Sequence, residues 1–305
     1  MNYEQARNGM LGLLVGDALG VPYEFTPSIY IPPFEEINYE PPKGFAKAHN
    51  VPAGTWSDDG SQALCVLDAI LTGKADETLE KAVGDRLLAW RTTGYWAVDG
   101  HVFDVGITTN SALNRIMSGV SAEKAGMTGE RTKSNGSLMR TLPIAILSSD
   151  DEIVRAAMGQ SRVTHAELEP MLCCAVYSLW AKYLTVNRLQ AVQAWQRAWD
   201  ALYKNVPKAV LPFVKYIEMW KGEHSGDGYC LDALYSAKDA VDQGTDFEST
   251  IRIAIQFGND TDTTAAIAGG IAGIKYGVPK HLLDGLRSKE MLEPLFALMK
   301  DRCTP

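Results

Sequence analysis

Apolar residues recur at helical spacing along most of the chain. Leu64, Leu67 and Leu71 follow one another at i, i+3 and i+7, so they share one face of a helix predicted over 61–71. Patterns of the same period predict further helices at 79–91, 111–117, 152–160, 167–183, 189–203, 231–242, 247–257 and 289–299. Sustained alternation of apolar and polar residues, which is typical of a half-buried strand, is nearly absent. The pattern therefore predicts an all-α fold.

Another apolar helix is predicted near the end of the chain, in the stretch GNDTDTTAAIAGGIAGI. Ile267, Ile271 and Ile274 share one of its faces. The apolar part of the stretch also contains three glycines, each of which weakens the helix propensity by about 1 kcal/mol. They are Gly269, Gly270 and Gly273. We expect close packing against a neighbouring helix to offset their cost.

The chain has no internal repeat, low-complexity tract or change in composition that would mark a linker. With 305 residues and 46% hydrophobic composition, it is long enough to bury a substantial core. We therefore expect a single compact domain over residues 1–305. The longest connection between predicted helices is the proline-rich segment 23–54, which is expected to be a lid or a surface wrap, because loops of this length are often functional.

The charge of the chain argues against one class of partner. A formal net charge of −8 and a pI near 5.2 disfavour general nucleic-acid binding through a broad basic face, since phosphate neutralisation needs many lysines and arginines. A small anionic ligand remains compatible with this charge where metal ions or backbone amides offset it locally.

Cysteine usage and hydropathy bear on the compartment. The five cysteines form no CxxC pair and lie in apolar surroundings, so we expect buried free thiols and a reducing compartment. They are Cys65, Cys173, Cys174, Cys230 and Cys303. The apolar stretch at the N-terminus is too short for a signal peptide or a membrane span, and no other run reaches the ~18 apolar residues that a spanning helix needs. A soluble, cytoplasmic protein without a membrane partner is expected.

Two oxygen-rich motifs, GTWSDDGS and GNDTDTT, each precede an apolar helix. Together they offer six oxygen donors and no histidine or cysteine: Ser57, Asp58, Asp59, Asp260, Asp262 and Thr263. One interpretation is helix capping, because serine and aspartate satisfy the free amides of a first turn. The other is a metal site, because clustered carboxylates repel one another without a cation, and all-oxygen donors suit Mg²⁺ or Mn²⁺. If the two helix starts converge, the donors suffice for two ions about 3.5–4 Å apart.

The chain resembles the ADP-ribosylglycohydrolases, a family that includes the hydrolase that reactivates ADP-ribosylated dinitrogenase reductase. Seven landmarks carry the resemblance in the family's order: GDALGVPYEF, WSDDG, FDVGITT, NGSLMR, THAELEP, SGDGYCLDAL and GNDTDTTAA. The resemblance covers nearly the whole chain. It implies an all-α fold, a centre of two Mg²⁺ or Mn²⁺ ions held by the six donors, and hydrolysis of the N- or O-glycosidic bond between ADP-ribose and an acceptor. One departure is Gly60, where many relatives have threonine.

The resemblance also assigns two carboxylates to the reaction. Glu24 matches the family's glutamate beside the bound sugar and is expected to be the general acid or base, whereas the residue pattern alone is typical of an exposed loop glutamate. Asp104 matches the aspartate that faces the guanidinium in arginine-specific relatives, with a capping or structural role as the alternative. The expected substrate is therefore an ADP-ribosylated arginine on a protein.

Five further residues are expected to contact the substrate: Asn135, Gly136, Ser137, His165 and Tyr229. The turn at 135–137 offers amides for a pyrophosphate, and Pro143 indicates that Ser137 lies in a loop. His165 is expected near the phosphates or the distal ribose, with a structural histidine as the alternative. Tyr229 is expected to stack on the adenine or to border the acceptor channel, with an ordinary core tyrosine as the alternative. The other histidines match no motif; they are His49, His101, His224 and His281.

Two other all-α enzyme classes are disfavoured by missing motifs. Prenyl-transferring and terpene-forming enzymes need DDxxD, but the sequence after Asp59 is GSQ, and HD-type phosphohydrolases need an adjacent His and Asp, which the chain lacks. A rival of a different class is a catalytically silent ADP-ribose-binding protein, or an immunity-type protein that blocks a toxin by occupying its active site. The presence of all six expected metal ligands favours the enzyme.

Overall fold

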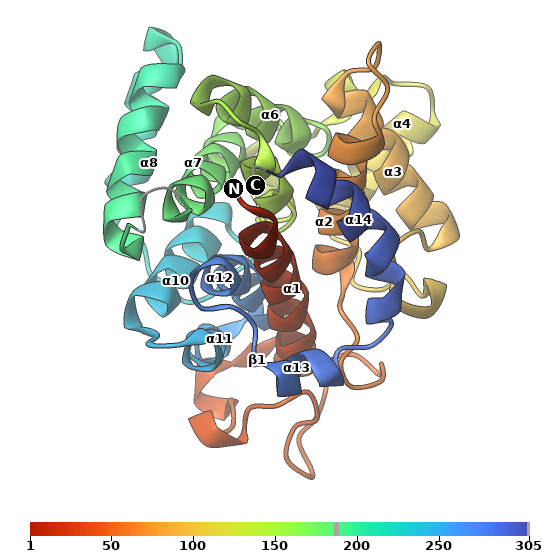
Figure 1. The fold of residues 1–305 in the computed structure, drawn as a ribbon, viewed down its shortest axis with the longest axis vertical. Coiled ribbons are helices and arrows are strands. Elements are labelled where there is room, and N and C mark those ends of the chain that lie inside the picture. The colour runs from red at the N-terminus through yellow and green to blue at the C-terminus, as the bar shows by residue number, and fades with distance from the viewer. Residues whose placement is uncertain (186–188, 304–305) are drawn as a thin grey trace.

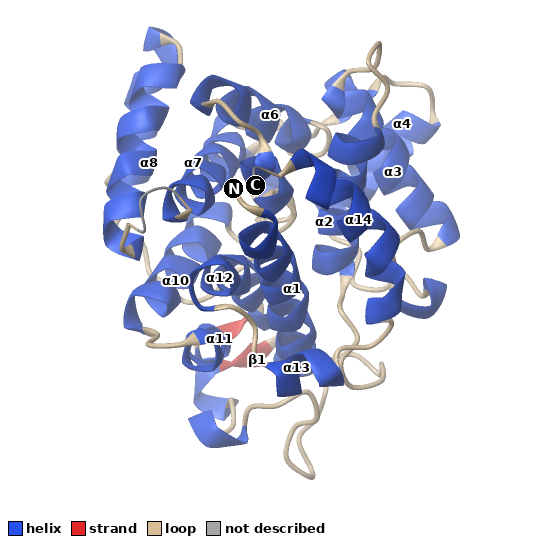
Figure 2. Ribbon diagram, in the orientation of Figure 1, coloured by secondary structure: helices blue, strands red, loops and turns tan. Residues whose placement is uncertain are grey.

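The computed structural model describes residues 1–185 and 189–303, and most of these residues lie in helices (Figure 1). Figure 2 shows the two strands of the described residues, β1 (Thr26–Pro27) and β2 (Gly258–Asn259), as one small patch among helices. In chain order the α-helices are α1 Tyr3–Gly20, α2 Asp58–Thr72, α3 Leu79–Thr93, α4 Ile107–Met117, α5 Ala122–Ala125, α6 Asp150–Arg162, α7 Leu168–Leu184, α8 Ala191–Asn205, α9 Leu211–Glu218, α10 Cys230–Gln243, α11 Phe247–Gln256, α12 Thr261–Tyr276, α13 Lys280–Gly285 and α14 Glu293–Arg302. The all-α prediction is confirmed.

Each helix predicted from periodicity has a counterpart, with ends that differ by a few residues. The largest differences concern the helices predicted at 111–117 and 289–299. The first, α4, begins at Ile107, and the second has a 3₁₀ turn over Lys289–Leu292 before α14 begins at Glu293. Pro294 lies in the first turn of α14, where its missing N–H costs no hydrogen bond.

Helix α1 was not predicted from the pattern, and its burial explains why. Every residue from Gly9 to Gly20 is buried, so the helix has no polar face along most of its length and therefore no amphipathic period. Its start is fixed by a capping box, in which the Asn2 side chain accepts from the Gln5 amide at 2.9 Å and the Gln5 side chain accepts from the Asn2 amide.

Helices α1 and α12 lie side by side in the middle of the molecule (Figure 1). Glycines allow this close approach, since a Cβ built on Gly12 would lie 2.2 Å from the carbonyl oxygen of Gly269. A Cβ on Gly273 would lie 2.1 Å from the carbonyl oxygen of Asn8. The predicted packing role of the α12 glycines is thus confirmed. Around this pair, α7, α10 and α11 pack against α12, whereas α2 and α14 pack against α1.

The five cysteines are free thiols, as predicted, and four of them are buried. The prediction of burial is wrong for Cys303, which is half-buried because it follows the last turn of α14 near the end of the chain. Within the described residues, none of the helices combines the length and the hydrophobicity that crossing a bilayer requires.

The segment 23–54 lies against the helices and is held at several points. The Tyr23 hydroxyl donates to the Asn38 carbonyl at 2.8 Å, and the Tyr39 hydroxyl donates to the Leu282 carbonyl at 2.9 Å. Near its start, β1 pairs antiparallel with β2, with Thr26 opposite Asn259. The segment therefore connects the end of α1 to the loop that leads into α12.

Candidate active site and metal centre

The last turns of α1 bring the two acidic helix starts together. The buried Asp17 carboxylate accepts from the backbone amides of Ser57 at 2.8 Å and Gly60 at 2.7 Å, which fixes the start of α2. At the start of α12, the Thr261 hydroxyl donates to the carbonyl of Gly20 at 2.9 Å. The structure also accounts for Gly60, because a Cβ there would lie 2.9 Å from Asp17 Oδ2.

The six expected metal ligands lie at these two helix starts, and a hydrogen bond joins the two motifs. Thr263 Oγ1 donates to Asp59 Oδ1 at 3.2 Å, although the residues lie 204 positions apart in the sequence. Helix capping explains Ser57, whose hydroxyl accepts from the Asp59 amide at 3.2 Å. It does not explain Asp260, which occupies the N-cap of α12 without a side-chain cap hydrogen bond.

The chemistry of this donor set fits divalent cations. Among the described residues, Asp59 Oδ2 and Asp262 Oδ2 are buried oxygens without a hydrogen-bond partner. Burial raises the pKa values of Asp58, Asp59 and Asp262 well above their usual range, and neighbouring carboxylates raise them further. A cation among these oxygens would offset two costs. It would give the unpartnered oxygens a ligand in place of water, and it would neutralise the buried negative charge.

Glu24 lies at the edge of the acidic cluster and is only 3% exposed, which rules out an exposed loop glutamate. Oxygens of Glu24, Asp260 and Asp262 all lie within 4.8 Å of one another. The position is set by the strand pair, since the Phe25 amide donates to the Asn259 carbonyl at 2.6 Å. Burial raises the pKa of Glu24 to about 8.

Asp104 reaches the same cavity from the segment before α4. Its side chain is 27% exposed, and its backbone has φ 51°, a left-handed conformation that non-glycine residues seldom adopt. Burial is the largest cause that raises the pKa of Asp104, which also lies 4.0 Å from the His49 ring nitrogen Nε2. Asp104 therefore faces the cavity and does not cap a helix, because the N-cap residue of α4 is Gly106.

These residues surround a cavity of about 400 Å³. Five carboxylates line it: Glu24, Asp58, Asp59, Asp104 and Asp260. Arg131, an exposed residue that our sequence analysis did not single out, is the one basic residue among the described residues that line it. The cavity is therefore strongly acidic around the proposed metal centre, with a single cation available for a phosphate.

The five expected substrate contacts divide into two groups. Asn135 and Gly136 line the cavity, and the Asn135 amide group donates to Asp260 Oδ2 at 2.8 Å. Ser137 lies in a turn, as its position before Pro143 indicates, but it is fully buried and hydrogen-bonds the Ser161 hydroxyl at 2.8 Å. Ser137 thus lies behind the cavity wall.

His165 and Tyr229 also lie outside the cavity lining. His165 is fully buried, with one ring nitrogen 2.8 Å from the Ser134 hydroxyl and the other 2.8 Å from the Thr164 hydroxyl. Burial lowers the pKa of His165 to about 3, so its ring is neutral at physiological pH. Tyr229 is half-buried and packs edge-on against Trp220, with ring centroids 6.0 Å apart.

A buried arginine organises the wall behind the cavity. Arg140 donates to Gln62 Oε1 at 2.8 Å, and Gln62 in turn donates to Asp58 Oδ2 at 2.7 Å. Arg140 also donates to the Gly136 carbonyl at 3.2 Å and to the Thr164 hydroxyl at 2.8 Å. The landmark NGSLMR ends in this arginine, but the sequence alone does not say which carbonyls and amides it meets.

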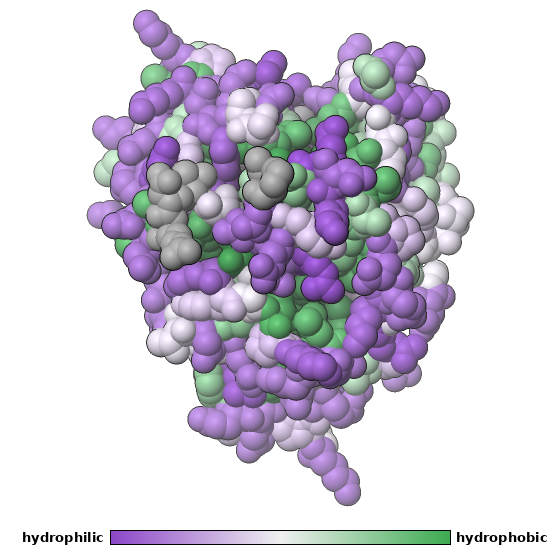
Figure 3. Space-filling view, viewed as in Figure 1, coloured by the Kyte–Doolittle hydropathy of each residue, from purple (hydrophilic) through white to green (hydrophobic). Residues whose placement is uncertain are grey.

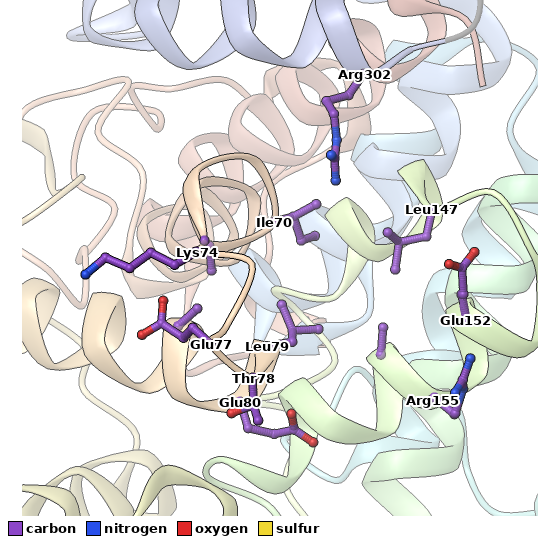
Figure 4. Close-up of a pocket in the computed structure, with 14 residues that line it drawn as sticks. Ile70, Lys74, Glu77, Thr78, Leu79, Glu80, Leu147, Glu152, Arg155 and Arg302 are labelled. Carbon is purple, nitrogen blue, oxygen red and sulfur yellow. The ribbon is translucent and has the colours of Figure 1, made fainter.

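A second cavity, of about 390 Å³, opens between α2, α3, α6 and α14 and contains none of the expected site residues. Figure 3 shows apolar side chains at the surface between α6 and α3. In Figure 4, Ile70, Leu79 and Leu147 face one another and Arg302 reaches toward them from α14. Its six charged lining residues are three cations and three anions: Lys74, Arg155, Arg302, Glu77, Glu80 and Glu152.

Known proteins resemble the chain over nearly its whole length. Residues 2–304 match the family model described as ADP-ribosylglycohydrolase. The "ADP-ribosylarginine hydrolase Tri1" of Serratia proteamaculans (strain 568) is 29% identical, over 96% of this chain and 78% of the relative. The "ADP-ribosyl-[dinitrogen reductase] glycohydrolase" of Rhodospirillum rubrum is 26% identical, over 90% of this chain and 87% of the relative.

A solved structure gives the same result. The "ADP-ribosylglycohydrolase-related protein complex" superposes with a TM-score of 0.77 and 28% sequence identity, and 99% of each chain is covered. The fold, the whole-chain family match and the acidic cavity agree with the resemblance found in the sequence. The chain therefore belongs to the ADP-ribosylglycohydrolase family, whose members hydrolyse glycosidic bonds of ADP-ribose.

Proposed function

We propose that this glycohydrolase depends on two divalent cations, Mg²⁺ or Mn²⁺, and that it releases ADP-ribose from modified arginines on proteins. The observation that carries the metal dependence is the pair of buried, unpartnered oxygens, Asp59 Oδ2 and Asp262 Oδ2, at the junction of α2 and α12. Bound cations would hold and polarise the substrate's oxygens and activate water for attack on the anomeric carbon.

The residues for the metal centre are the six oxygen donors of the two motifs. Asp59 and Asp262 contribute the buried carboxylates, and Thr263 contributes a hydroxyl that already hydrogen-bonds Asp59. The absence of nitrogen and sulfur among the six donors favours a hard cation over zinc or copper. The number of donors supports two ions and exceeds what helix capping needs.

Glu24 is the proposed general acid and base. A ribosyl bond breaks through an oxocarbenium-like transition state, which a carboxyl group assists by transferring a proton. Glu24 suits this role because its buried carboxyl lies beside Asp260 and Asp262, and because a pKa raised to about 8 lets it hold a proton near neutral pH. Burial thus raises the proton affinity of the Glu24 carboxyl, and the pairing of β1 with β2 fixes the position of Glu24.

Asp104 is the proposed recognition group for the arginine side chain. It faces the cavity from the wall that leads into α4, and a carboxylate can accept two hydrogen bonds from a guanidinium. Two relatives named ADP-ribosylarginine hydrolase Tri1, 29% and 30% identical to this chain, support the arginine linkage. The acidic lining of the cavity further suits a cationic acceptor.

The remaining contacts are assigned according to their exposure. Asn135, Gly136 and Arg131 line the cavity and are proposed to bind the ADP-ribose, with the Arg131 guanidinium on the pyrophosphate. The buried residues hold this wall in place, since His165 contacts Ser134 and Ser137 contacts Ser161. Tyr229 is the N-cap residue of α10 and follows Gly228, which lines the cavity.

One assay tests both parts of the proposal. The metal-depleted protein is incubated with ADP-ribosylated arginine, ADP-ribosylated serine and O-acetyl-ADP-ribose, with and without Mg²⁺ or Mn²⁺, and free ADP-ribose is measured. We expect release from the arginine conjugate, only with metal. Release without metal would contradict the metal dependence, preference for another conjugate would contradict the arginine linkage, and no release from any conjugate would favour a silent ADP-ribose binder.

A further inference from the structure

His49, which matches no motif, reaches the proposed catalytic glutamate from the long segment between α1 and α2. Its ring nitrogen Nε2 hydrogen-bonds Glu24 Oε2, and the same nitrogen lies 4.0 Å from Asp104 Oδ1. The His49 side chain is 16% exposed. A single imidazole thus lies against both carboxylates assigned to the reaction, from a part of the chain that carries none of the six expected metal ligands.

The ring of His49 is held between aromatic side chains. Its centroid lies 5.1 Å from that of Phe103 and 6.0 Å from that of Phe25. His101 stacks on Phe103 at 5.9 Å, but among the described residues His49 is the only histidine that hydrogen-bonds Glu24. Aromatic packing restricts the rotamers of a side chain. The ring therefore has little freedom to turn away from Glu24.

The segment that carries His49 is also anchored near both ends. The Asn38 amide and carbonyl both hydrogen-bond the Tyr23 hydroxyl, at 2.9 and 2.8 Å. After His49, the Gly54 carbonyl accepts from the Arg287 amide at 3.0 Å. A Cβ on Gly54 would lie 2.0 Å from the Gly285 carbonyl oxygen, so the backbone approaches α13 closely here. These contacts on both sides of His49 fix the segment, so that the imidazole is held at the cavity.

We propose that His49 is a positioning residue that fixes the orientation of the Glu24 carboxyl for proton transfer. Among the described residues, His49 is the only nitrogen donor to the Glu24 side chain, and the carboxylates of Asp104 and Asp260 repel its charged form. A Nε2–H group that donates to Glu24 Oε2 selects one rotamer and leaves the other carboxyl oxygen for the substrate or water. The hydrogen bond to Glu24 is also the main cause that raises the pKa of His49.

This inference rests on the proposed role of Glu24, and its test uses variants matched to the geometry. His49→Ala removes the donor, His49→Gln keeps an N–H donor, and His101→Ala is the control, because it also removes a ring from Phe103. Steady-state kinetics with an ADP-ribosylated arginine conjugate and Mn²⁺ titrations are measured for each. We expect His49→Ala to lower kcat by about 10- to 100-fold with KM nearly unchanged.

Three further results are expected if His49 acts through Glu24. His49→Gln regains most of the lost kcat, His101→Ala stays close to the wild type, and His49→Ala adds little to the loss already caused by Glu24→Gln. A rise of KM alone would make His49 a substrate contact. Equal losses in the Ala and Gln variants, full additivity with Glu24→Gln, or loss of Mn²⁺ binding would each overturn the positioning role.

A spectroscopic measurement separates failure of this inference from failure of the proposed function. If the wild type releases no ADP-ribose, the hydrolase proposal fails, yet the His49–Glu24 contact can still be measured through the ring nitrogens of His49 by NMR. We expect the Nε2 signal to shift on Glu24→Ala and to stay in place on His101→Ala. If the Nε2 signal of His49 did not shift in Glu24→Ala, this result would contradict the contact between His49 and Glu24.

Discussion

Two cavities of nearly equal volume, about 400 and 390 Å³, differ mainly in how their charges are paired. In the cavity between α2, α3, α6 and α14, Arg155 pairs with Asp151 at 2.8 Å and Glu77 pairs with Lys81 at 3.1 Å. Glu152 in the same cavity accepts from the Ser149 hydroxyl at 2.7 Å. Three of its six charged lining residues therefore have partners on the protein itself, and its cations and anions are equal in number.

The cavity at the starts of α2 and α12 shows the opposite arrangement. Five carboxylates face one arginine there, and the adjoining Asp59 Oδ2 and Asp262 Oδ2 are buried without a partner among the described residues. A folded protein tolerates such uncompensated groups only where something else offsets their cost, and this is typical of functional sites. Unpaired buried charge, and not the size of the cavity, is therefore the feature on which we base the proposed active site.

The largest effect is expected from removing one of the unpaired carboxylates. Asp59→Asn and Asp262→Asn each keep the side-chain size but weaken the metal centre, so turnover of an ADP-ribosylated arginine conjugate should fall by about 1,000-fold. Circular dichroism controls for folding. Turnover within about tenfold of the wild type in either variant would mean that the unpaired oxygens do not serve the reaction.

Glu24→Gln should lower kcat by about 100-fold, because an amide cannot transfer the proton that the carboxyl transfers. Binding of ADP-ribose should persist, since the substrate contacts and the metal ligands remain. Calorimetry with ADP-ribose, beside the kinetic assay, checks this division. Joint loss of binding and turnover would instead give Glu24 a structural role at the edge of the acidic cluster.

Arg131→Gln should raise KM by about tenfold with kcat nearly unchanged, because a charge-assisted hydrogen bond from an exposed arginine to a phosphate contributes about 1.5 kcal/mol, the low end of the usual range. Lys133, two residues later, is the matched control, since it pairs with Glu169 at 2.9 Å and does not line the cavity. If Lys133→Gln and Arg131→Gln gave the same KM, the pyrophosphate assignment would be wrong.

The stability of the metal-free protein should depend on pH in a direction set by the raised pKa values. A carboxyl whose pKa is raised in the folded state binds more protons there than in the unfolded chain, so its contribution to stability is lost as pH rises through the folded pKa. For Glu24 that value is about 8. We therefore expect the metal-free protein to melt at least about 2 °C lower near pH 9 than near pH 6.

Differential scanning fluorimetry checks this pH dependence, and saturating Mg²⁺ should raise the melting temperature more at the higher pH. The control is Asp262→Asn, measured in the same way, because it lacks one of the buried charges. A metal-free wild type that became more stable between these pH values would contradict the burial of uncompensated carboxylates.

The smallest effect is expected in the second cavity. Arg302→Gln should leave kcat/KM within about twofold of the wild type, because Arg302 lies at the end of α14 in a cavity that holds none of the proposed catalytic or metal-binding residues. A larger loss of activity would show that the two cavities are coupled and would break the contrast between them.

Most of the helices could be predicted from the sequence, because an amphipathic helix repeats its apolar residues with the helical period. The two acidic motifs were also visible in the sequence, and because their six candidate ligands offer only oxygen donors, they predicted a hard divalent cation. The sequence did not reveal α1, whose residues from Gly9 to Gly20 are buried on all sides. That helix is the element that joins the motifs, through Asp17 to Ser57 and through Gly20 to Thr261.

The site residues that could not be predicted from the sequence are those whose role depends on contacts between distant parts of the chain. His49 lies 25 positions from Glu24, and Arg140 lies 78 positions from Gln62, so neither pair forms a local motif. Conversely, Ser137 and His165 belong to landmark motifs but lie behind the cavity wall, because a motif records residue order and not which side chains face the solvent. Exposure is decided by packing that no single stretch specifies.

The proposed metal centre requires that the starts of α2 and α12 hold the cations jointly. Titration of metal-depleted protein with Mn²⁺, followed by calorimetry and by electron paramagnetic resonance, measures this directly in the wild type, Asp59→Asn and Asp262→Asn. We predict two Mn²⁺ per wild-type chain and loss of tight binding in each variant, although the substituted residues lie on different helices. Wild-type binding of Mn²⁺ that survives either substitution unchanged would contradict the shared centre.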